Sequence, residues 1–233
     1  MRMVGRSGGK MMKSLNRVII SLSFFFFLFG ISRCKTPTQP SNNSDNGDEV
    51  INLGIVTADY IELSKITRIS KFRSGVGHDY SDSSESCRSM KHYFVPQNYP
   101  VKIFSPVTGS ISYLTQEWAG TQVGIQAGNR TFVIFHVNLS GSLNVGSTVS
   151  AGQKIGTRIG TQTWSDIAVW ENNKLLSYFD VMSDSVFQNY QSRGVATPSK
   201  LIISQANRDA DPLICNGDTF QSAGNTPNWV DLN

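Results

Sequence analysis

The sequence contains no internal repeat, no P-loop, no Rossmann glycine pattern and no heptad, and long stretches of helical periodicity are scarce. It therefore gives no indication of a solenoid, a nucleotide-binding α/β domain or a coiled coil. Histidine and cysteine are also rare, with three of each in 233 residues. Chemistry that needs these side chains must use a small, countable set.

The N-terminal segment has the organisation of an export signal. Residues 1–17 carry five basic side chains and no acid, and an unbroken run of apolar residues and serine follows from Val18 to Ile31. These fourteen residues fit the core of a signal peptide, whereas a membrane span needs about 20. We predict that residues 1–33 are a signal peptide and that the protein is exported to the cell envelope.

A cysteine and a polar segment follow this run. Residues 34–50 are rich in Pro, Asn and Ser and cannot bury enough surface to fold, which predicts a flexible tether. An apolar core, a cysteine and a tether together resemble a bacterial lipoprotein, and this resemblance implies a membrane anchor through lipidated Cys34. Arg33 departs from the small residue usual before that cysteine. Ordinary signal cleavage, with Cys34 as an incidental thiol, is the alternative.

Removal of the leader changes the charge balance of the chain. The whole sequence has a formal net charge of +4, but from Cys34 onward 15 Lys and Arg stand against 17 Asp and Glu, a net charge of about −2. The basic isoelectric point therefore belongs mostly to the leader. We expect no nucleic-acid partner, because that requires a basic face on the folded body.

Two cysteines remain if Cys34 is lipidated. Cys87 and Cys215 then form an even set in an oxidising compartment, which predicts a disulfide that fastens the C-terminal part to the body. Two free buried thiols are the alternative.

The body of the chain shows short runs of β-forming residues separated by turn residues. Between Leu175 and the preceding run, Glu171-Asn172-Asn173-Lys174 favours a tight hairpin, because asparagine tolerates left-handed geometry. We predict a mainly β fold, an antiparallel sandwich or barrel-like sheet, over residues 51–182, with an insertion at 83–100. Residues 183–233 are predicted to form an irregular C-terminal extension packed on this domain. The runs are 101–104, 110–114, 122–126, 131–137, 154–159, 167–170 and 175–179.

A two-part phrase in the body resembles two known families. It has Pro106, Gly109 and Ile111 in the pattern P-x-x-G-x-I, and residues 145–156 in the pattern V-G-x-x-V-x-x-G-Q-x-I-G. One family is the biotinyl or lipoyl carrier domain, which needs a modifiable lysine at a hairpin tip. Met90-Lys91 lies before the phrase, so the carrier is set aside. The other is the lysostaphin-type zinc endopeptidases, murein hydrolases with the fold called the duplicated hybrid motif.

Residues on both sides of this phrase extend the peptidase resemblance. His78 and Asp82 form H-x-x-x-D, which in the family supplies two zinc ligands. His136 lies in a strand that ends in H-x-x-L and would polarise the substrate beside the metal. The family then expects H-x-H, but this sequence has Asp166-Ile167-Ala168. Strand alternation places residues 166 and 168 on one face, yet Ala168 has no donor atom.

The missing ligand leaves two interpretations of the site. A catalytic zinc usually has three protein ligands, and Asp166, or His92 from the 83–100 insertion, would have to complete the set. Otherwise the domain is degenerate, needs no cofactor, and retains His136 and Asp166 only as residues of a former catalytic site. His78 and Asp82 would then simply hydrogen-bond a loop, and His136 would be a core histidine.

We predict a cell-envelope lipoprotein whose peptidase-like domain is inactive and acts as a binding or regulatory module for peptidoglycan or a wall hydrolase. Aromatic residues near the groove suit a peptide or glycan ligand: Tyr80, Trp118, Trp164 and Trp170. An active zinc endopeptidase on peptidoglycan peptides is the alternative. A surface adhesin or structural lipoprotein is a third possibility, for which the sequence offers nothing specific.

Overall fold

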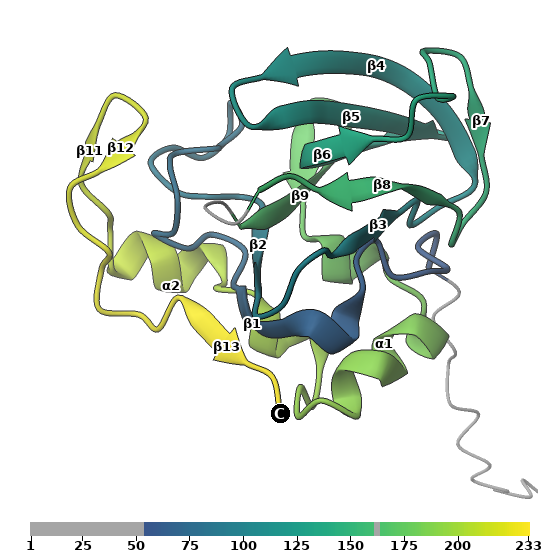
Figure 1. Cartoon of the computed structure of the whole chain (residues 1–233). Coiled ribbons are helices and arrows are strands. Elements are labelled where there is room, and N and C mark those ends of the chain that lie inside the picture. Colours follow the sequence, from purple (N-terminus) through teal and green to yellow (C-terminus); the bar gives the residue numbers. More distant parts are fainter. Residues whose placement is uncertain (1–53, 161–163) are drawn as a thin grey trace, which may run out of the picture. The chain divides into compact units, whose positions relative to one another are not determined.

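A computed structural model of the chain describes residues 54–160 and 164–233 (Figure 1). The predicted signal peptide, Cys34 and the 34–50 tether lie outside the described residues. The described residues form one compact unit. None of the helices in the described ranges has the length and apolar composition needed to span a bilayer.

The prediction of a mainly β, antiparallel fold is confirmed. The principal sheet has eleven strands, and its longest path runs β13-β1-β2-β9-β6-β5-β4-β7. Strand β10 is paired with β9, and β8 connects β3 to β6. The strands are β1 (Ile66–Ser70), β2 (His92–Pro96), β3 (Lys102–Phe104), β4 (Gly109–Glu117), β5 (Gly120–Ala127), β6 (Arg130–Leu139), β7 (Thr148–Val149), β8 (Lys154–Arg158), β9 (Ser165–Glu171), β10 (Lys174–Leu176) and β13 (Trp229–Asp231).

The remaining elements are short. They are the 3-10 helices η1 (Leu63–Lys65), η2 (Tyr178–Val181) and η3 (Pro198–Leu201), the α-helices α1 (Asp184–Gln191) and α2 (Gln205–Ala210), and the hairpin of β11 (Cys215–Asn216) and β12 (Thr219–Phe220). Figure 1 shows α1 and α2 on the side of the sheet away from β4 and β5. The chain then returns to the sheet, where β13 pairs with β1.

Turn chemistry accounts for the tight connections. Asn172 and Asn173 join β9 to β10 with φ angles of 49° and 63°, as the hairpin prediction requires. Gly128 has a φ of 61° between β5 and β6. Both positions lie in the left-handed region that Gly and Asn adopt most easily.

Side-chain alternation divides the core between the two faces of the sheet. On strands β6 and β9, Ile134 and Ile167 face the large cluster that also holds Phe94, Phe179 and Tyr190. The neighbouring residues on the same strands, Val133, Phe135 and Ala168, face a smaller cluster on the opposite side of the sheet. This cluster is formed by Phe72, Met90, Val133, Phe135, Ala168 and Leu175. The predicted residues His78, His136 and Asp166 lie on this second face, whereas His92 faces the large cluster.

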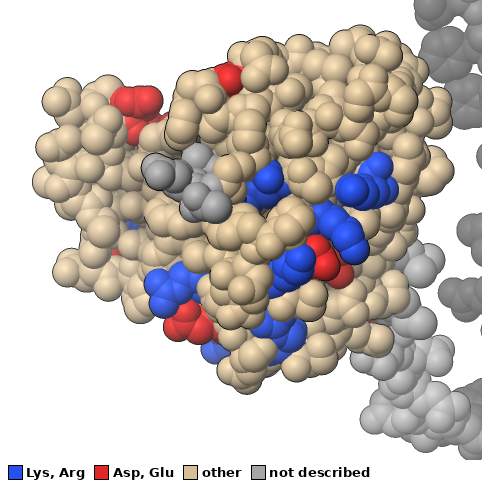
Figure 2. All heavy atoms as spheres, in the orientation of Figure 1, with Lys and Arg blue, Asp and Glu red and all other residues tan. Residues whose placement is uncertain are grey.

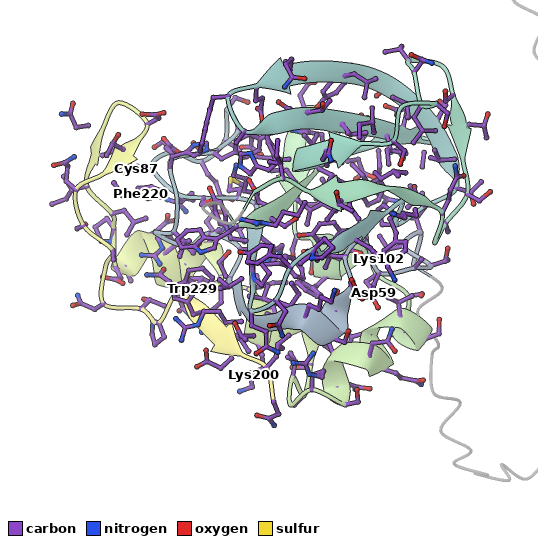
Figure 3. All side chains as sticks on the ribbon, in the orientation of Figure 1. Asp59, Cys87, Lys102, Lys200, Phe220 and Trp229 are labelled. Atoms are coloured by element: carbon purple, nitrogen blue, oxygen red, sulfur yellow. A yellow bond between two sulfur atoms is a disulfide. The ribbon has the colours of Figure 1, made fainter. Side chains whose placement is uncertain are left out.

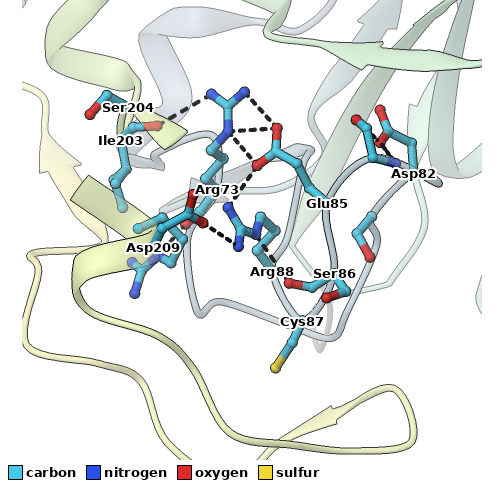
Figure 4. A network of polar contacts seen from close by, with 12 residues as sticks. Arg73, Asp82, Glu85, Ser86, Cys87, Arg88, Ile203, Ser204 and Asp209 are labelled. Carbon is cyan, nitrogen blue, oxygen red and sulfur yellow. Dashed lines mark hydrogen bonds and ion pairs between the residues drawn. The ribbon is translucent and has the colours of Figure 1, made fainter. Parts of the chain in front are cut away.

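The predicted disulfide between Cys87 and Cys215 is confirmed, with an S–S distance of 2.05 Å. Cys87 lies beside the β11–β12 hairpin, close to Phe220 (Figure 3). The loop that carries Cys87 is also held by ion pairs, in which the buried Glu85 carboxylate accepts from Arg73 and Arg88, and Arg88 reaches Asp209 (Figure 4). This part of the chain is therefore fixed to the C-terminal segment by covalent and ionic links.

Charged side chains of both signs occur on the face shown in Figure 2. Lys and Arg lie mostly across its middle and lower parts with some Asp and Glu beside them, and further acidic residues lie at the top and upper left. An exposed ion pair joins Arg68 of β1 to Asp231 of β13 at 2.9 Å.

Candidate functional site

Pairing of β2 with β9 creates the centre of the site. Tyr93 lies opposite Asp166 in the ladder. Because side chains alternate along a strand, Lys91 and Tyr93 share the face of Asp166 and Ala168. Residues 92–96, part of the segment that the sequence suggests is an insertion, are therefore a strand of the sheet between β1 and β9.

A buried ion pair occupies this face. Lys91 is 2% exposed and Asp166 is 0% exposed, and Lys91 Nζ lies 2.5 Å from Asp166 Oδ2. The same ammonium is 3.3 Å from His78 Nε2. A charge taken out of water is tolerated only with a close partner and further stabilising contacts, and this lysine has both.

Aromatic rings supply those further contacts. The ammonium of Lys91 lies 4.0 Å from the centroid of Phe135, 4.9 Å from that of Tyr80 and 5.0 Å from that of Tyr93. Burial raises the pKa of the Tyr80 phenol above its ordinary value, so the ring is neutral. Three aromatic rings and one carboxylate thus form a cage for a single cation.

His78 enters the site from a loop that the C-terminal hairpin holds. Its Nδ1 is 2.9 Å from the carbonyl oxygen of Asp79, to which it donates, so Nε2 is free to accept from Lys91. The Asp79 carboxylate in turn accepts from the backbone amides of Cys87 and Arg88. Gly77 precedes this loop with a φ of 75°, and a Cβ there would lie 2.1 Å from the Tyr93 hydroxyl.

A bulge in β6 directs His136 into the site. Across β5, Thr121 pairs with Val137 but Val123 pairs with Ile134, so β6 holds an extra residue at this point. His136 has a φ of 60°, which is uncommon for a residue other than glycine. Because of the bulge, Val137 takes the place in the large core that alternation would give to His136.

The ring of His136 links two carboxylates. Its Nε2 is 3.3 Å from Asp166 Oδ1, and its Nδ1 is 3.2 Å from the carbonyl oxygen of Ala119 and 3.8 Å from Glu117 Oε2. Three residues predicted from the sequence therefore do come together: Lys91 joins His78 to Asp166, and His136 contacts the same Asp166 carboxylate.

The residues present do not fit a zinc ion. Asp82, the second predicted ligand, accepts from the backbone amide of Leu175 and from Ser84. Desolvation raises the pKa of Asp82, but the hydrogen bonds to its carboxylate lower the pKa by more, so the pKa lies below its ordinary value. Ala168 is buried among apolar side chains. Among the residues that the structure describes, no three His, Cys, Asp or Glu side chains are grouped to hold a metal ion.

His92 lies on the other face of β2, away from the site. It is fully buried, donates from Nδ1 to the Ser70 carbonyl and accepts at Nε2 from the Ser177 hydroxyl. Its ring packs against Phe179. Burial lowers the pKa of His92 to about 4. His92 is therefore a core histidine that does not fold over the cleft.

A cavity of about 360 Å³ opens beside the ion pair. It is lined by His78, Tyr80, Lys91, Glu117, Trp118, Gln122, Phe135 and His136. This volume is within the range of small-ligand sites. Trp118 stands at its edge and is 85% exposed, whereas Trp164 packs against Tyr93 and Trp229.

Lys91 and Glu117 are the functional candidates that sequence reasoning missed. Lys91 is the only lysine in the segment Met90–Pro96, whose other residues are apolar or aromatic apart from His92. A lone lysine in such a run is a signal for a buried cation. Nothing in the local sequence marks Glu117, because its role depends on the hairpin that brings it to His136.

Comparison with known proteins gives only distant structural likeness. No protein-family model and no curated protein matches the chain. Csd3 of Helicobacter pylori is similar with a TM-score of 0.38 and 19% identity over 48% of this chain and 33% of that one. The match thus spans about a third of the Csd3 structure. The structure of a SpoIIQ–SpoIIIAH pore-forming complex is similar with a TM-score of 0.42 and 11% identity, over 56% of this chain and 94% of that one. Lysostaphin is similar with a TM-score of 0.30 and 18% identity, over 44% of this chain and 47% of that one. TM-scores this low identify no family for this chain.

Proposed function

We propose that residues 54–233 form a peptidase-like binding module that lacks peptidase activity and holds a peptide of the bacterial cell wall. The proposal includes export by the signal at 1–33 and a membrane anchor through lipidated Cys34. The observation that carries it is the position of the Lys91 ammonium between His78 and Asp166. A fixed internal cation thus contacts His78, a zinc-ligand position in the resemblance to lysostaphin-type enzymes, and Asp166, which occupies the first position of the expected H-x-H motif.

Charge and space both argue against a metal at this point. A divalent ion bound by His78 and Asp166 would have to displace a positive ammonium from its carboxylate. The third family position is Ala168, and the Asp82 carboxylate is engaged by the Leu175 amide. Without a metal there is no activated water of the kind that zinc peptidases use.

The cavity favours a small ligand over a large protein surface. Its volume of about 360 Å³ suits a short peptide, and the exposed indole of Trp118 offers a face for stacking. A wall hydrolase is the second candidate partner, and it would be expected to contact the exposed indole without filling the cavity.

The test uses the full-length protein with its disulfide intact. We expect no stoichiometric zinc by elemental analysis, no cleavage of purified peptidoglycan, and binding of soluble muropeptides by calorimetry. Trp118→Ala should weaken that binding, whereas Trp229→Phe, on the β13 edge, should leave it unchanged. Absence of muropeptide binding would contradict the proposal.

An active zinc endopeptidase is the alternative function, and one observation favours it: His78 and Asp166 approach the same point in space. Stoichiometric zinc that disappears in both His78→Ala and Asp166→Ala, together with peptidoglycan cleavage, would establish the enzyme. Zinc that persists in both variants would place the metal elsewhere in the chain.

A further inference from the structure

The cavity contains an acidic group that the domain itself does not satisfy. Glu117 ends β4, and its Oε2 atom is buried without a hydrogen-bond partner among the described residues. The Nδ1 atom of His136 is 3.8 Å from this oxygen and lies closer to the Ala119 carbonyl oxygen. A carboxylate with a buried oxygen that lacks a donor is costly, so such a group in the wall of a cavity indicates a ligand that donates to the carboxylate.

The other ionised groups of the site already have partners. Asp166 is matched by Lys91 at 2.5 Å. The Lys91 ammonium is enclosed by this carboxylate, His78 and the aromatic rings. The lysine therefore offers little to an anionic ligand, and Glu117 remains as the charged group available for recognition.

An exposed aromatic ring stands next to this carboxylate. Trp118 follows Glu117 at the tip of the β4–β5 hairpin, and its ring centroid is 6.0 Å from that of His136. Indole faces attract cations more strongly than the other aromatic side chains do. The cavity wall already contains one contact between a cation and an aromatic ring, since the Lys91 ammonium lies 4.0 Å from the centroid of Phe135.

We propose that this cavity recognises a protonated primary amine on its ligand. The ammonium would donate a hydrogen bond to the Glu117 carboxylate, whose side chain is 24% exposed, and lie against the face of Trp118. This inference rests on the proposed function, because it specifies which part of a wall peptide enters the cavity. The amine belongs to an amino side chain or to a free peptide N-terminus.

The experiment compares soluble muropeptides that carry free amines with the same preparation acetylated by acetic anhydride. We expect calorimetry to show at least tenfold weaker binding after acetylation. Glu117→Gln keeps the shape of the side chain but removes its charge, so it should bind both preparations with equal, weak affinity. Glu171→Gln is the matched control, because Glu171 is similarly exposed but paired with Arg130. It should retain the preference for the free amine.

Each outcome has a defined meaning. Equal binding of free and acetylated muropeptides by the unmodified protein would overturn the amine proposal and leave the binding module standing. A preference that survives in Glu117→Gln would also overturn it, since the carboxylate would then not be the recognising group. Failure of every muropeptide to bind would remove both proposals. Competition by tetraalanine, whose amine is N-terminal, would support a terminal amine, and its failure alongside a positive acetylation result would support a side-chain amine.

Discussion

Replacement of Lys91 by methionine tests the internal cation directly. Methionine keeps most of the length and the apolar stem of lysine but removes the ammonium, and so leaves the fully buried Asp166 without its partner at 2.5 Å. Breaking a buried pair on one side typically costs about 3–5 kcal/mol. This cost includes the loss of the contacts between the Lys91 ammonium and the three aromatic rings. Since domains of this kind are stable by only about 5–15 kcal/mol, the effect should be large.

A double-mutant cycle isolates the pair itself. Asp166→Asn alone leaves the ammonium buried without a carboxylate and should cost a similar amount, whereas Lys91→Met combined with Asp166→Asn should cost about 2–3 kcal/mol less than the sum. The matched control is the Arg68–Asp231 pair, which has the short distance of 2.9 Å but side chains that are 44% and 74% exposed. Its coupling energy should be about 0–1 kcal/mol.

Urea unfolding at neutral pH, with the disulfide oxidised and the m-value checked in each variant, gives the four free energies for each cycle. If the coupling energy between Lys91 and Asp166 is no larger than that of the surface pair, the buried ion pair makes no major contribution to the stability of the fold, and the reasoning is refuted. The same variants can be taken into elemental analysis, so the energetic and metal tests use one set of proteins.

Three further predictions concern the surroundings of the site. Burial lowers the pKa of His92 from 6.5 to about 4, so the unfolded chain takes up a proton that the folded state excludes. The free energy of unfolding should therefore fall as the pH drops through 6.5 and level off below about 4. Between pH 7.5 and 4.5 the unmodified protein should lose about 2.5 kcal/mol more than His92→Gln in urea unfolding, and parallel pH curves would contradict this. Removal of the disulfide by Cys87→Ala and Cys215→Ala, which opens a loop with a sequence separation of 128, should cost about 4–5 kcal/mol, and a cost under about 1 kcal/mol would contradict the chain-entropy account. Gly77→Ala and Gly128→Ala each place alanine at a positive φ, which costs about 1–2 kcal/mol. Only Gly77→Ala also places a Cβ against Tyr93, so this variant should show the larger decrease in melting temperature. Equal decreases in the two variants would contradict a close contact with Tyr93.

Local sequence rules account for much of the fold. Alternating β-formers predicted an antiparallel, mainly β body, and the paired asparagines predicted the β9–β10 hairpin, because both signals depend on a few consecutive residues. The pairing of Cys87 with Cys215 followed from the cysteine count together with the expectations that Cys34 is lipidated and that the protein is exported. The shared face of Asp166 and Ala168 followed from strand periodicity, because no bulge interrupts β9 between these two residues.

Only the tertiary structure decided how the site is filled. Lys91 reaches Asp166 because β2, although distant in sequence, pairs with β9, and no local pattern specifies that partner. The bulge that turns His136 toward Asp166 depends on the register between β5 and β6. The sequence shows three histidines, but only the structure separates His92, which is buried in the core, from His78, which contacts Lys91, and His136, which contacts Asp166. The chain thus carries the motif residues locally, while long-range pairing places an ammonium among them.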